Sequence, residues 1–224
     1  MVRLQIMLCL TMETAFHTTG NARRFGVDKV LARDAGGRLV LPATSIKGFL
    51  REKAELLLRS WGQSVCVGPE PGQMCKGQNL CRICRVFGNP RQPSTLRFED
   101  GRPGGKDVEE RERTDVRSGV SISRHRRATY AQRLFFIETT MPQPIQWQAS
   151  ATGYFPDADQ AREAAALIAL AAAWGVAIGG AKSRGLGWLK AIQVRAAIDG
   201  QEVPPKDLQD IWLQWQGGNR VGDH

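Results

Sequence analysis

The chain has 224 residues, of which 42% are hydrophobic, and a formal net charge of +9. A chain of this length can bury a substantial core, and its excess of cations favours a polyanionic partner, most simply nucleic acid, over an acidic small substrate. Residues 2–12 alternate between apolar and polar side chains, which predicts a half-buried strand rather than a signal peptide. The longest apolar run, residues 164–178, is shorter than the ~20 residues that span a bilayer. We therefore expect a cytoplasmic protein with no membrane partner.

The segment after the first strand combines a basic loop with a helix start that suits an anion. The loop contains the pair Arg23 and Arg24, and residues 38–41 are predicted to form a short strand. A helix is predicted over residues 45–61, where Ser45 offers an N-cap hydroxyl. The free N–H groups of a helix N-terminus attract anions, so this segment could bind phosphate.

A single acid, Asp28, lies among the cations that precede this helix. A carboxylate near a phosphate site needs a reason, because the two anions repel each other, and catalysis or metal binding is one such reason. A solvent-exposed turn is the simpler interpretation, which the segment taken alone favours.

Four cysteines are grouped in the next segment: Cys66, Cys75, Cys81 and Cys84. The C-x-x-C pair that ends the group is typical of one half of a zinc site, and four thiolates complete a tetrahedral ion with no open position. The segment has little apolar content, so a structural zinc ion could order it. Free or redox-active thiols are the alternative. The fifth cysteine, Cys9, is expected in the core or on a sheet face.

The remaining elements complete a repeated β-α-β order. The predicted elements are a strand at 96–99, a polar segment at 100–133, an antiparallel pair of strands at 134–140 and 145–154, a helix at 158–174 and a strand at 188–194. This order predicts an α+β fold with a ferredoxin-like core, which is also the scaffold of many RNA-recognition domains. We expect one domain over 1–195, interrupted by a zinc knuckle at about 62–90 and an excursion at about 100–133. Residues 196–224 should form a C-terminal helix and a flexible tail.

Two further segments could contact RNA. The sequence SISRHRRATYAQR has no acid, and its arginines Arg124, Arg126 and Arg127 could bind phosphate or stack on nucleobases. A solvated loop of mixed charge is the alternative for the wider segment. Residues 178–190, which we call the glycine loop, connect a helix to a strand, and glycines there let the backbone approach a ligand. A tight connection that needs positive φ angles is the simpler interpretation of this loop.

Three separated groups of residues resemble one family. They are Phe16-His17-Thr18-Thr19-Gly20 with Gly26-Val27-Asp28 and the helix start Leu41-Pro42-Ala43-Thr44-Ser45-Ile46-Lys47-Gly48 followed by Arg51; Cys81-x-x-Cys84-Arg85-Val86-Phe87-Gly88; and Gly179-Gly180-x-Lys182-Ser183-Arg184-Gly185-x-Gly187. In this order they resemble the RAMP proteins of type III CRISPR systems. The greatest similarity is to the backbone subunits of Csm-type effectors, the Cas-seven group.

The resemblance implies a subunit that binds CRISPR RNA along an effector complex, beside adjacent backbone subunits and other type III subunits, and cleaves target RNA. It implies that the guide backbone contacts Ser45, Lys47, Arg51 and the glycine-loop residues Gly179, Gly180, Lys182, Ser183 and Arg184. It also implies that residues 121–133 belong to a thumb between guide and target RNA. We expect further RNA contacts from His17, Arg23 and Arg24, although a structural hydrogen bond is an equal possibility for His17.

Asp28 matches the acid that the family requires for target cleavage. It could position a divalent cation such as Mg²⁺ or Mn²⁺, or accept the 2′-OH proton, while a kinked duplex aligns that hydroxyl with the scissile phosphate. The chain departs from the family pattern after this acid, where Lys29 and Val30 replace the usual proline. A binding-only backbone subunit is therefore one alternative. An endoribonuclease that processes precursor CRISPR RNA and an unrelated zinc-containing RNA-binding protein are two others.

Overall fold

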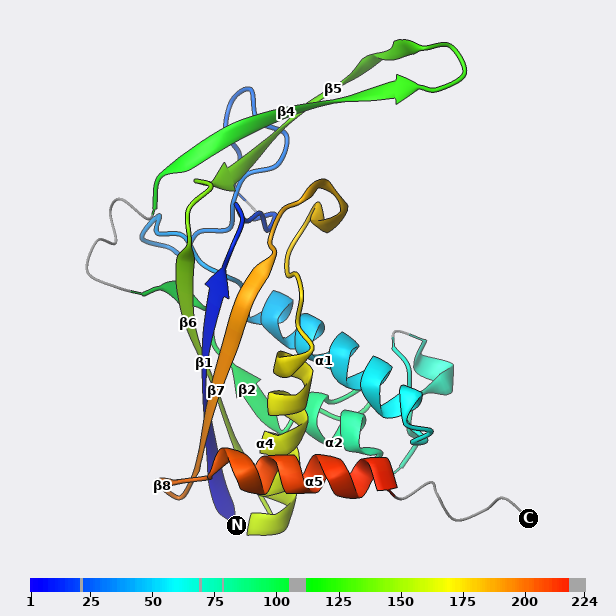
Figure 1. Cartoon of the computed structure of the whole chain (residues 1–224), viewed down its shortest axis with the longest axis vertical. Helices are drawn as coiled ribbons and strands as arrows, with labels where there is room; N and C mark the ends of the chain where they lie inside the picture. The colour runs from blue at the N-terminus through cyan, green and yellow to red at the C-terminus, as the bar shows by residue number, and fades with distance from the viewer. Residues whose placement is uncertain (21, 69, 78, 105–111, 218–224) are drawn as a thin grey trace.

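The computed structural model describes residues 1–20, 22–68, 70–77, 79–104 and 112–217. Its centre is an antiparallel sheet in the order β2-β6-β1-β7-β8, with the short β3 also paired to β6 (Figure 1). The strands are β1 (Val2–Met12), β2 (Leu96–Phe98), β3 (Arg102–Pro103), β6 (Ile145–Phe155), β7 (Leu189–Ile198) and β8 (Gln201–Glu202). The predicted mixed α+β fold is confirmed.

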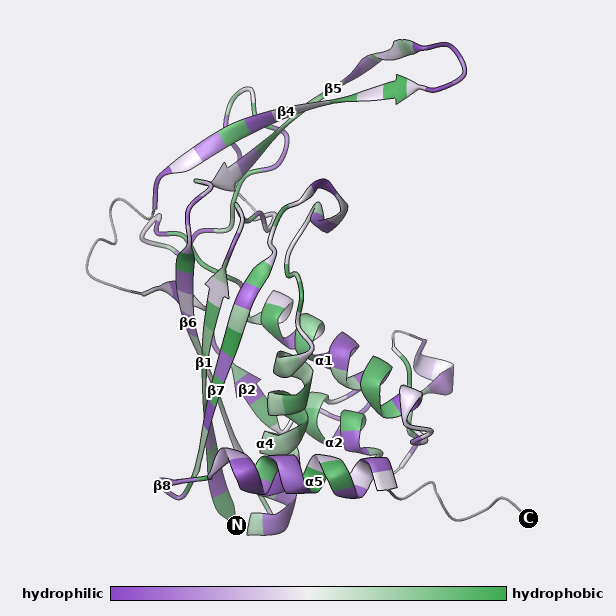
Figure 2. Cartoon of the chain, in the orientation of Figure 1, coloured by the Kyte–Doolittle hydropathy of each residue, from purple (hydrophilic) through white to green (hydrophobic). Residues whose placement is uncertain are grey.

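The helices cover one face of this sheet, and the core lies between the two layers (Figure 1). They are α1 (Ala43–Ser60), the short α2 (Arg82–Phe87), α4 (Ala158–Ala173) and α5 (Pro205–Gly217), with 3₁₀ turns η1 at Pro71–Gln73 and η2 at Lys182–Arg184. Helix α4 is hydrophobic along most of its length (Figure 2), and its small alanines let it pack closely against the sheet and α1. The indole N–H of Trp212 donates to the carbonyl of Ala166 at 2.7 Å, which fastens α5 to α4.

The other face of the sheet is open. Side chains on β1 alternate along the strand, so Leu4, Ile6 and Leu8 enter the core while Met7 and Cys9 lie on the open face. The sheet-face position expected for Cys9 is the one observed. No described helix is long and apolar enough to cross a membrane.

A two-stranded hairpin projects from the end of the sheet (Figure 1). It consists of β4 (Thr114–Ser123) and β5 (Ala128–Thr140). The predicted pairing of 134–140 with 145–154 is wrong, because β5 pairs with β4 whereas β6 pairs with β1, β2 and β3. Backbone hydrogen bonds hold the end of β5 beside the loop after β1: Thr140 N–H donates to Phe16 O and Glu138 N–H donates to Lys29 O, each at 2.9 Å. The intervening prolines therefore join two separate sheets instead of closing one hairpin.

Several boundaries also differ from the predictions. Residues 38–41 form isolated bridges, Arg33 to Leu39 and Leu41 to Gly101, rather than a strand. Helix α1 begins at Ala43, so Ser45 lies inside its first turn and no side chain caps the helix from position 42. The predicted flexible tail at 218–224 and part of the predicted excursion, residues 105–111, lie outside the described residues.

Candidate nucleic-acid interface

The glycine loop packs directly against the segment that follows β1. The amide N–H of Gly180 donates to the carbonyl of His17 at 2.8 Å. Gly179 has a φ of +92°, and a Cβ atom there would lie 2.4 Å from the same carbonyl oxygen. Both the left-handed backbone and the close approach therefore require glycine at this position. The loop presents Lys182, Ser183 and Arg184 on the exposed turn η2.

His17 lies inside the protein beneath this loop and is 2% exposed. Its Nδ1 atom lies 2.6 Å from Glu138 O and its Nε2 atom lies 3.0 Å from Thr19 Oγ1. Burial is the largest influence on this ring and lowers the pKa of His17, which favours the neutral form. These contacts favour the structural role over a direct contact with RNA, because both ring nitrogens already have partners.

Asp28 is exposed at the root of the hairpin. Its carboxylate Oδ2 accepts a hydrogen bond from Phe136 N–H at 2.6 Å, and its own N–H donates to Phe136 O at 3.0 Å. The next residue, Lys29, forms a parallel bridge with Ile137. No ion pair involves Asp28 within the described part of the chain. The carboxylate is thus anchored through one oxygen, and the side chain remains open to solvent.

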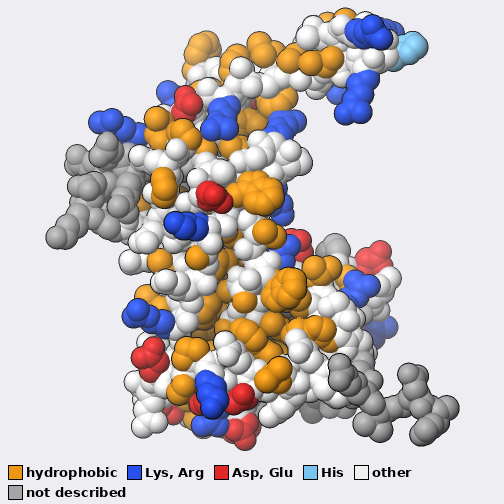
Figure 3. All heavy atoms as spheres, viewed as in Figure 1, with side chains coloured by type: hydrophobic (Ala, Val, Ile, Leu, Met, Phe, Trp, Pro, Cys, Tyr) orange, Lys and Arg blue, Asp and Glu red, His pale blue; other side chains and the backbone are white. Residues whose placement is uncertain are grey.

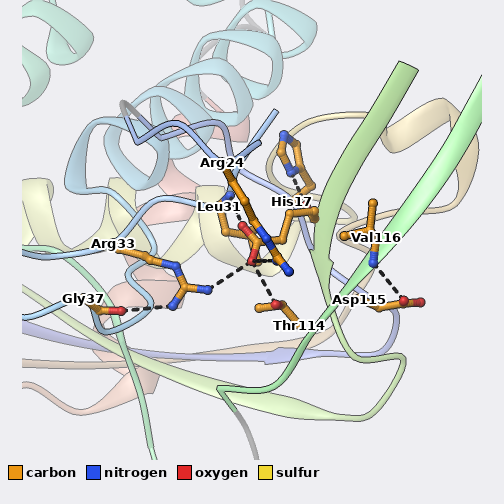
Figure 4. Close-up of polar contacts among 9 residues, drawn as sticks. His17, Arg24, Leu31, Arg33, Gly37, Thr114, Asp115 and Val116 are labelled. Atoms are coloured by element: carbon orange, nitrogen blue, oxygen red, sulfur yellow. Dashed lines mark hydrogen bonds and ion pairs between the residues drawn. The ribbon is translucent and has the colours of Figure 1, made fainter. Parts of the chain in front are cut away.

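Glu138 is a buried carboxylate that the sequence analysis missed. Figure 4 labels the residues that contact it: Arg24, Leu31, Arg33 and Thr114. Its Oε2 accepts from Leu31 N–H at 3.0 Å, and its Oε1 accepts from Arg33 Nη2 at 3.1 Å and Thr114 Oγ1 at 2.8 Å. Arg24 Nη1 lies 3.5 Å from the same Oε1. Burial opposes ionisation, but the hydrogen bonds from Leu31, Thr114 and Arg33 outweigh it and lower the pKa of Glu138. The group therefore fastens the loop that carries Asp28 to both strands of the hairpin.

One signal in the sequence could have indicated this role. Glu138 is the only acid between Asp115 and Asp157, and it follows the apolar run Leu134 to Ile137. An isolated acid within an apolar strand is expected to be buried and paired.

A second contact joins the glycine loop to the hairpin. The guanidinium of Arg184 lies over the ring of Phe135, 4.7 Å from its centroid. The ring crosses Gly119 on the facing strand so closely that a Cβ atom there would lie 2.2 Å from Phe135 Cζ. A hollow of about 270 Å³ separates the two elements, and Arg117 also lines it. The stacked pair and this hollow place two cations beside Phe135, which precedes the residue that anchors Asp28.

The start of α1 continues this surface. Ser45 Oγ and Thr18 Oγ1 lie 3.4 Å apart, which connects the helix to the loop beneath the glycines. The first free N–H of the helix is already used, because Ala43 N–H donates to Asp100 Oδ1 at 2.7 Å. The helix N-terminus is therefore occupied in part by the protein's own carboxylate, and side chains rather than the terminus would provide most of the attraction for phosphate.

Lys47 and Arg51 are half-buried, one turn apart, on the next stretch of α1. Arg51 donates to Glu55 Oε1 at 2.7 Å and to Gly88 O at 2.8 Å. Its guanidinium therefore also links α1 to the segment after α2.

The arginines of the hairpin lie farther from this group. Arg124, Arg126 and Arg127 are exposed in the turn at the hairpin tip, where cationic side chains gather (Figure 3). Arg127 has a φ of +51°, and Ser123 Oγ accepts from Arg126 N–H at 3.1 Å. Exposed apolar side chains, among them Ile122 and Tyr130, line the strands below the tip. Arg23 is also exposed, in the loop that precedes Asp28.

The four predicted metal ligands come together. The sulfur atoms of Cys66, Cys75, Cys81 and Cys84 all lie within 4.8 Å of one another. The sulfurs of the first two are 3.4 Å apart, close to the roughly 3.8 Å edge of a tetrahedron with Zn–S bonds of about 2.3 Å. Burial, the contact with Cys75 and the charge of Cys81 raise the pKa of Cys66 to about 12, and a cation among the sulfurs would remove that obstacle to ionisation. This cluster could hold a metal ion such as zinc.

Asp28 differs from the four cysteines in having no comparable group of metal-ligating side chains around it in the described ranges. The cysteine cluster is the one group of three or more potential metal-ligating side chains in the described ranges. A cation at Asp28 would therefore draw most of its oxygen ligands from RNA phosphate and water, which is the usual pattern for Mg²⁺.

The structure therefore links Asp28, the glycine loop and Ser45 through contacts with β5 and with residues 16–20, and the hairpin arginines lie farther out. Lys47 lies two residues after Ser45 on α1, so its side chain faces another side of the helix. Residues 9–190 match the family model described as the RAMP superfamily. No curated protein matches the chain.

Proposed function

Because this chain belongs to the RAMP superfamily, we propose that it is an RNA-binding backbone subunit of a type III CRISPR effector complex. The observation that carries the proposal is the set of contacts that links the hairpin, the glycine loop and the start of α1, which joins exposed cations to a backbone loop that approaches closely through Gly179 and Gly180. The sheet order β2-β6-β1-β7, with both long helices on one face, supports interpreting the core as ferredoxin-like. The match to the Csm-type, Cas-seven group remains part of this proposal.

The guide RNA would follow the glycine loop and α1. Lys182, Ser183 and Arg184 offer donors to phosphates, and Ser45 and Lys47 continue the path. The hairpin, with its tip arginines and exposed Ile122 and Tyr130, would act as the thumb between guide and target. Such contacts are independent of sequence, which suits a subunit that must accept any guide.

Asp28 is the residue we propose for target cleavage. A kink at the hairpin would align a 2′-OH with the scissile phosphate, and the free Oδ1 of Asp28 could accept the proton of that hydroxyl. The 2′-oxygen would bond to phosphorus as the bond to the 5′-oxygen breaks, which leaves a 2′,3′-cyclic phosphate and a 5′-hydroxyl that takes its proton from water. A divalent cation held by Asp28 would stabilise the negative charge that develops on the phosphate. The anchor at Phe136 N–H fixes the carboxylate while leaving one oxygen for this chemistry.

The arrangement of the histidines bears on the alternative of precursor processing. That reaction needs a general acid or base, and His17 is buried with both nitrogens bonded. His125 lies at the hairpin tip, away from Asp28, and His224 lies outside the described residues. We therefore favour target cleavage over precursor processing.

The test is a reconstituted complex with guide and labelled target RNA. We expect Asp28→Asn to keep guide and target affinity while cleavage falls by at least about 100-fold, the usual range for loss of general acid–base catalysis. Asp115→Asn, a change of the same chemistry on the hairpin, is the control and should cleave normally. If Asp28→Asn cleaves as fast as wild type, or if wild type binds but does not cleave, the chain is a binding-only subunit. Failure of the complex to bind guide RNA would remove the proposal.

A further inference from the structure

A cavity of about 620 Å³ lies between α1 and the segment that follows α2. One wall carries Lys47, Gly48 and Arg51, and the other is formed by Gly68, Met74 and residues 87–94. Its volume falls within the range of 300–1,000 Å³ typical of small-ligand sites. On α1 the cavity begins at Lys47, two residues after Ser45.

Among the described residues, Lys47 is the cation at this cavity that lacks a counter-charge. Two acids line it, but Glu55 is bonded to Arg51 and Glu52 is paired with Lys53. Lys47 has no ion-pair partner in the part of the chain that the structure describes, and burial, followed by the charge of Arg51, lowers its pKa. The Arg51 guanidinium also lacks one acceptor, because its buried Nη2 atom makes no hydrogen bond. An anion beside these two cations would supply the counter-charge that Lys47 lacks.

The opposite wall is apolar. Met74 and Phe87 are 6% and 2% exposed, and Pro90 and Pro93 lie at the rim. The exposed side chain of Gln92 makes no hydrogen bond within the described ranges and provides an amide edge. Asn89 also lines the cavity, but its amide is already bonded to Cys75 O and to the N–H groups of Arg91 and Gln92. A largely apolar wall with one amide left for a ligand suits a flat heterocycle that has both donors and acceptors.

We infer that this cavity binds one unstacked nucleotide of the bound RNA, with its phosphate beside Lys47 and Arg51 and its nucleobase against Met74 and Phe87. This inference rests on the proposed RNA-binding function and adds a site that reads a single nucleotide. A phosphate alone would leave the apolar wall unused, and an apolar ligand would leave Lys47 without a counter-charge. A nucleotide satisfies both halves of the cavity.

Gly48 provides the means to close the cavity. It lies on α1 between the two cations, and a Cβ atom added there would meet nothing within 4 Å. Gly48→Leu would therefore place a side chain in the cavity without straining the helix, and Gly48→Ala is its matched control. Both changes replace a glycine in the interior of the helix, and losing that glycine stabilises the helix by about 1 kcal/mol.

The experiment uses the full chain with single-stranded RNA that carries one 4-thiouridine, moved through successive positions and crosslinked by long-wavelength ultraviolet light. We expect crosslinks within residues 74 and 87–94 as well as on the hairpin, identified by mass spectrometry. Gly48→Leu should lower the yield at the cavity by about tenfold, equivalent to 1.4 kcal/mol, while the hairpin crosslinks persist. Gly48→Ala should crosslink like wild type.

The outcomes separate this inference from the proposed function. Crosslinks on the hairpin or glycine loop with none at the cavity, or an equal yield from Gly48→Leu, would overturn the inference and leave RNA binding intact. No crosslink anywhere on the chain would remove the proposed function as well. Adenosine monophosphate is added as a competitor: if it binds the cavity although RNA never crosslinks there, the site takes a free nucleotide and the inference is wrong.

Discussion

Replacing Glu138 with glutamine should destabilise the protein far more than its small chemical change suggests. The carboxylate is 1% exposed and accepts hydrogen bonds on both oxygens, from Arg33 and Thr114 on one and from Leu31 N–H on the other. A carboxamide has only one acceptor oxygen, so its NH₂ group must face a donor on one side. The loss of the charge and one buried donor left unpaired together cost about 3 kcal/mol.

Thermal unfolding followed by differential scanning calorimetry measures this effect. For a chain of this size, about 3 kcal/mol lowers Tm by roughly 6–12 °C. The control is Glu52→Gln, since Glu52 has a 58% exposed side chain whose one ion pair among the described residues is with Lys53. That surface pair contributes about 0–1 kcal/mol, so Tm should change by less than about 4 °C. If the Tm of Glu138→Gln equals that of the Glu52→Gln control, the carboxylate does not fasten the hairpin.

The same residue predicts a dependence on pH. Hydrogen bonds lower the pKa of Glu138 in the folded protein despite its burial, so the folded state binds fewer protons than the unfolded state. The stabilisation is therefore fully present above the unfolded pKa, about 4.3 for glutamate, and disappears as the pH falls through the lower folded pKa. The Tm difference between wild type and Glu138→Gln should accordingly be constant near neutral pH and shrink below about pH 4. A difference that grows on acidification would contradict the assignment.

Two further predictions concern the metal cluster and the glycine loop. The purified protein should contain about one zinc ion per chain, measured by elemental mass spectrometry. Cys81→Ser should reduce the zinc content, whereas Cys9→Ser on the open sheet face should not. A metal-free wild type would refute the assignment. Gly179→Ala should destabilise the fold more than Gly185→Ala, because both have positive φ angles but only the first brings a Cβ within 2.4 Å of a backbone oxygen. The second change should cost only the ~1–2 kcal/mol of a left-handed backbone, and equal losses in denaturant unfolding would show that the contact with His17 is unimportant.

The elements of the core could be predicted because their sequence patterns are local. Alternation over residues 2–12 matches β1, and the apolar periodicity of the long helices matches α1 and α4 within two residues. The four cysteines could be predicted to lie together because cysteines in such a polar segment have few structural roles other than binding a metal. The pairing of 134–140 was wrong for the opposite reason. A proline turn between two alternating segments resembles a hairpin, whereas β5 pairs with β4 and is held by contacts with residues 16–31, which are remote in sequence.

The helix start illustrates a second limit of the sequence. Proline followed by hydroxyl residues indicates a helix N-terminus, and α1 does begin there. The carboxylate that occupies its first N–H belongs to Asp100, which the sequence places far away. The attraction for phosphate thus moves from the backbone to Lys47 and Arg51, and toward the cavity that these two side chains border.

The position of Asp28 depends on the hairpin more than on the loop that carries it. Two hydrogen bonds tie Asp28 to Phe136, and the buried Glu138, two residues farther along β5, binds Leu31 of the same loop. Arg184 of the glycine loop stacks on Phe135 of the same strand. Three nearby residues of β5, namely Phe135, Phe136 and Glu138, thus hold the proposed guide contact Arg184 and the loop of the proposed catalytic acid against the proposed thumb. If a duplex bends against the hairpin tip, the acid at its root keeps its position relative to the thumb, which is the geometric condition that in-line cleavage at a kink requires.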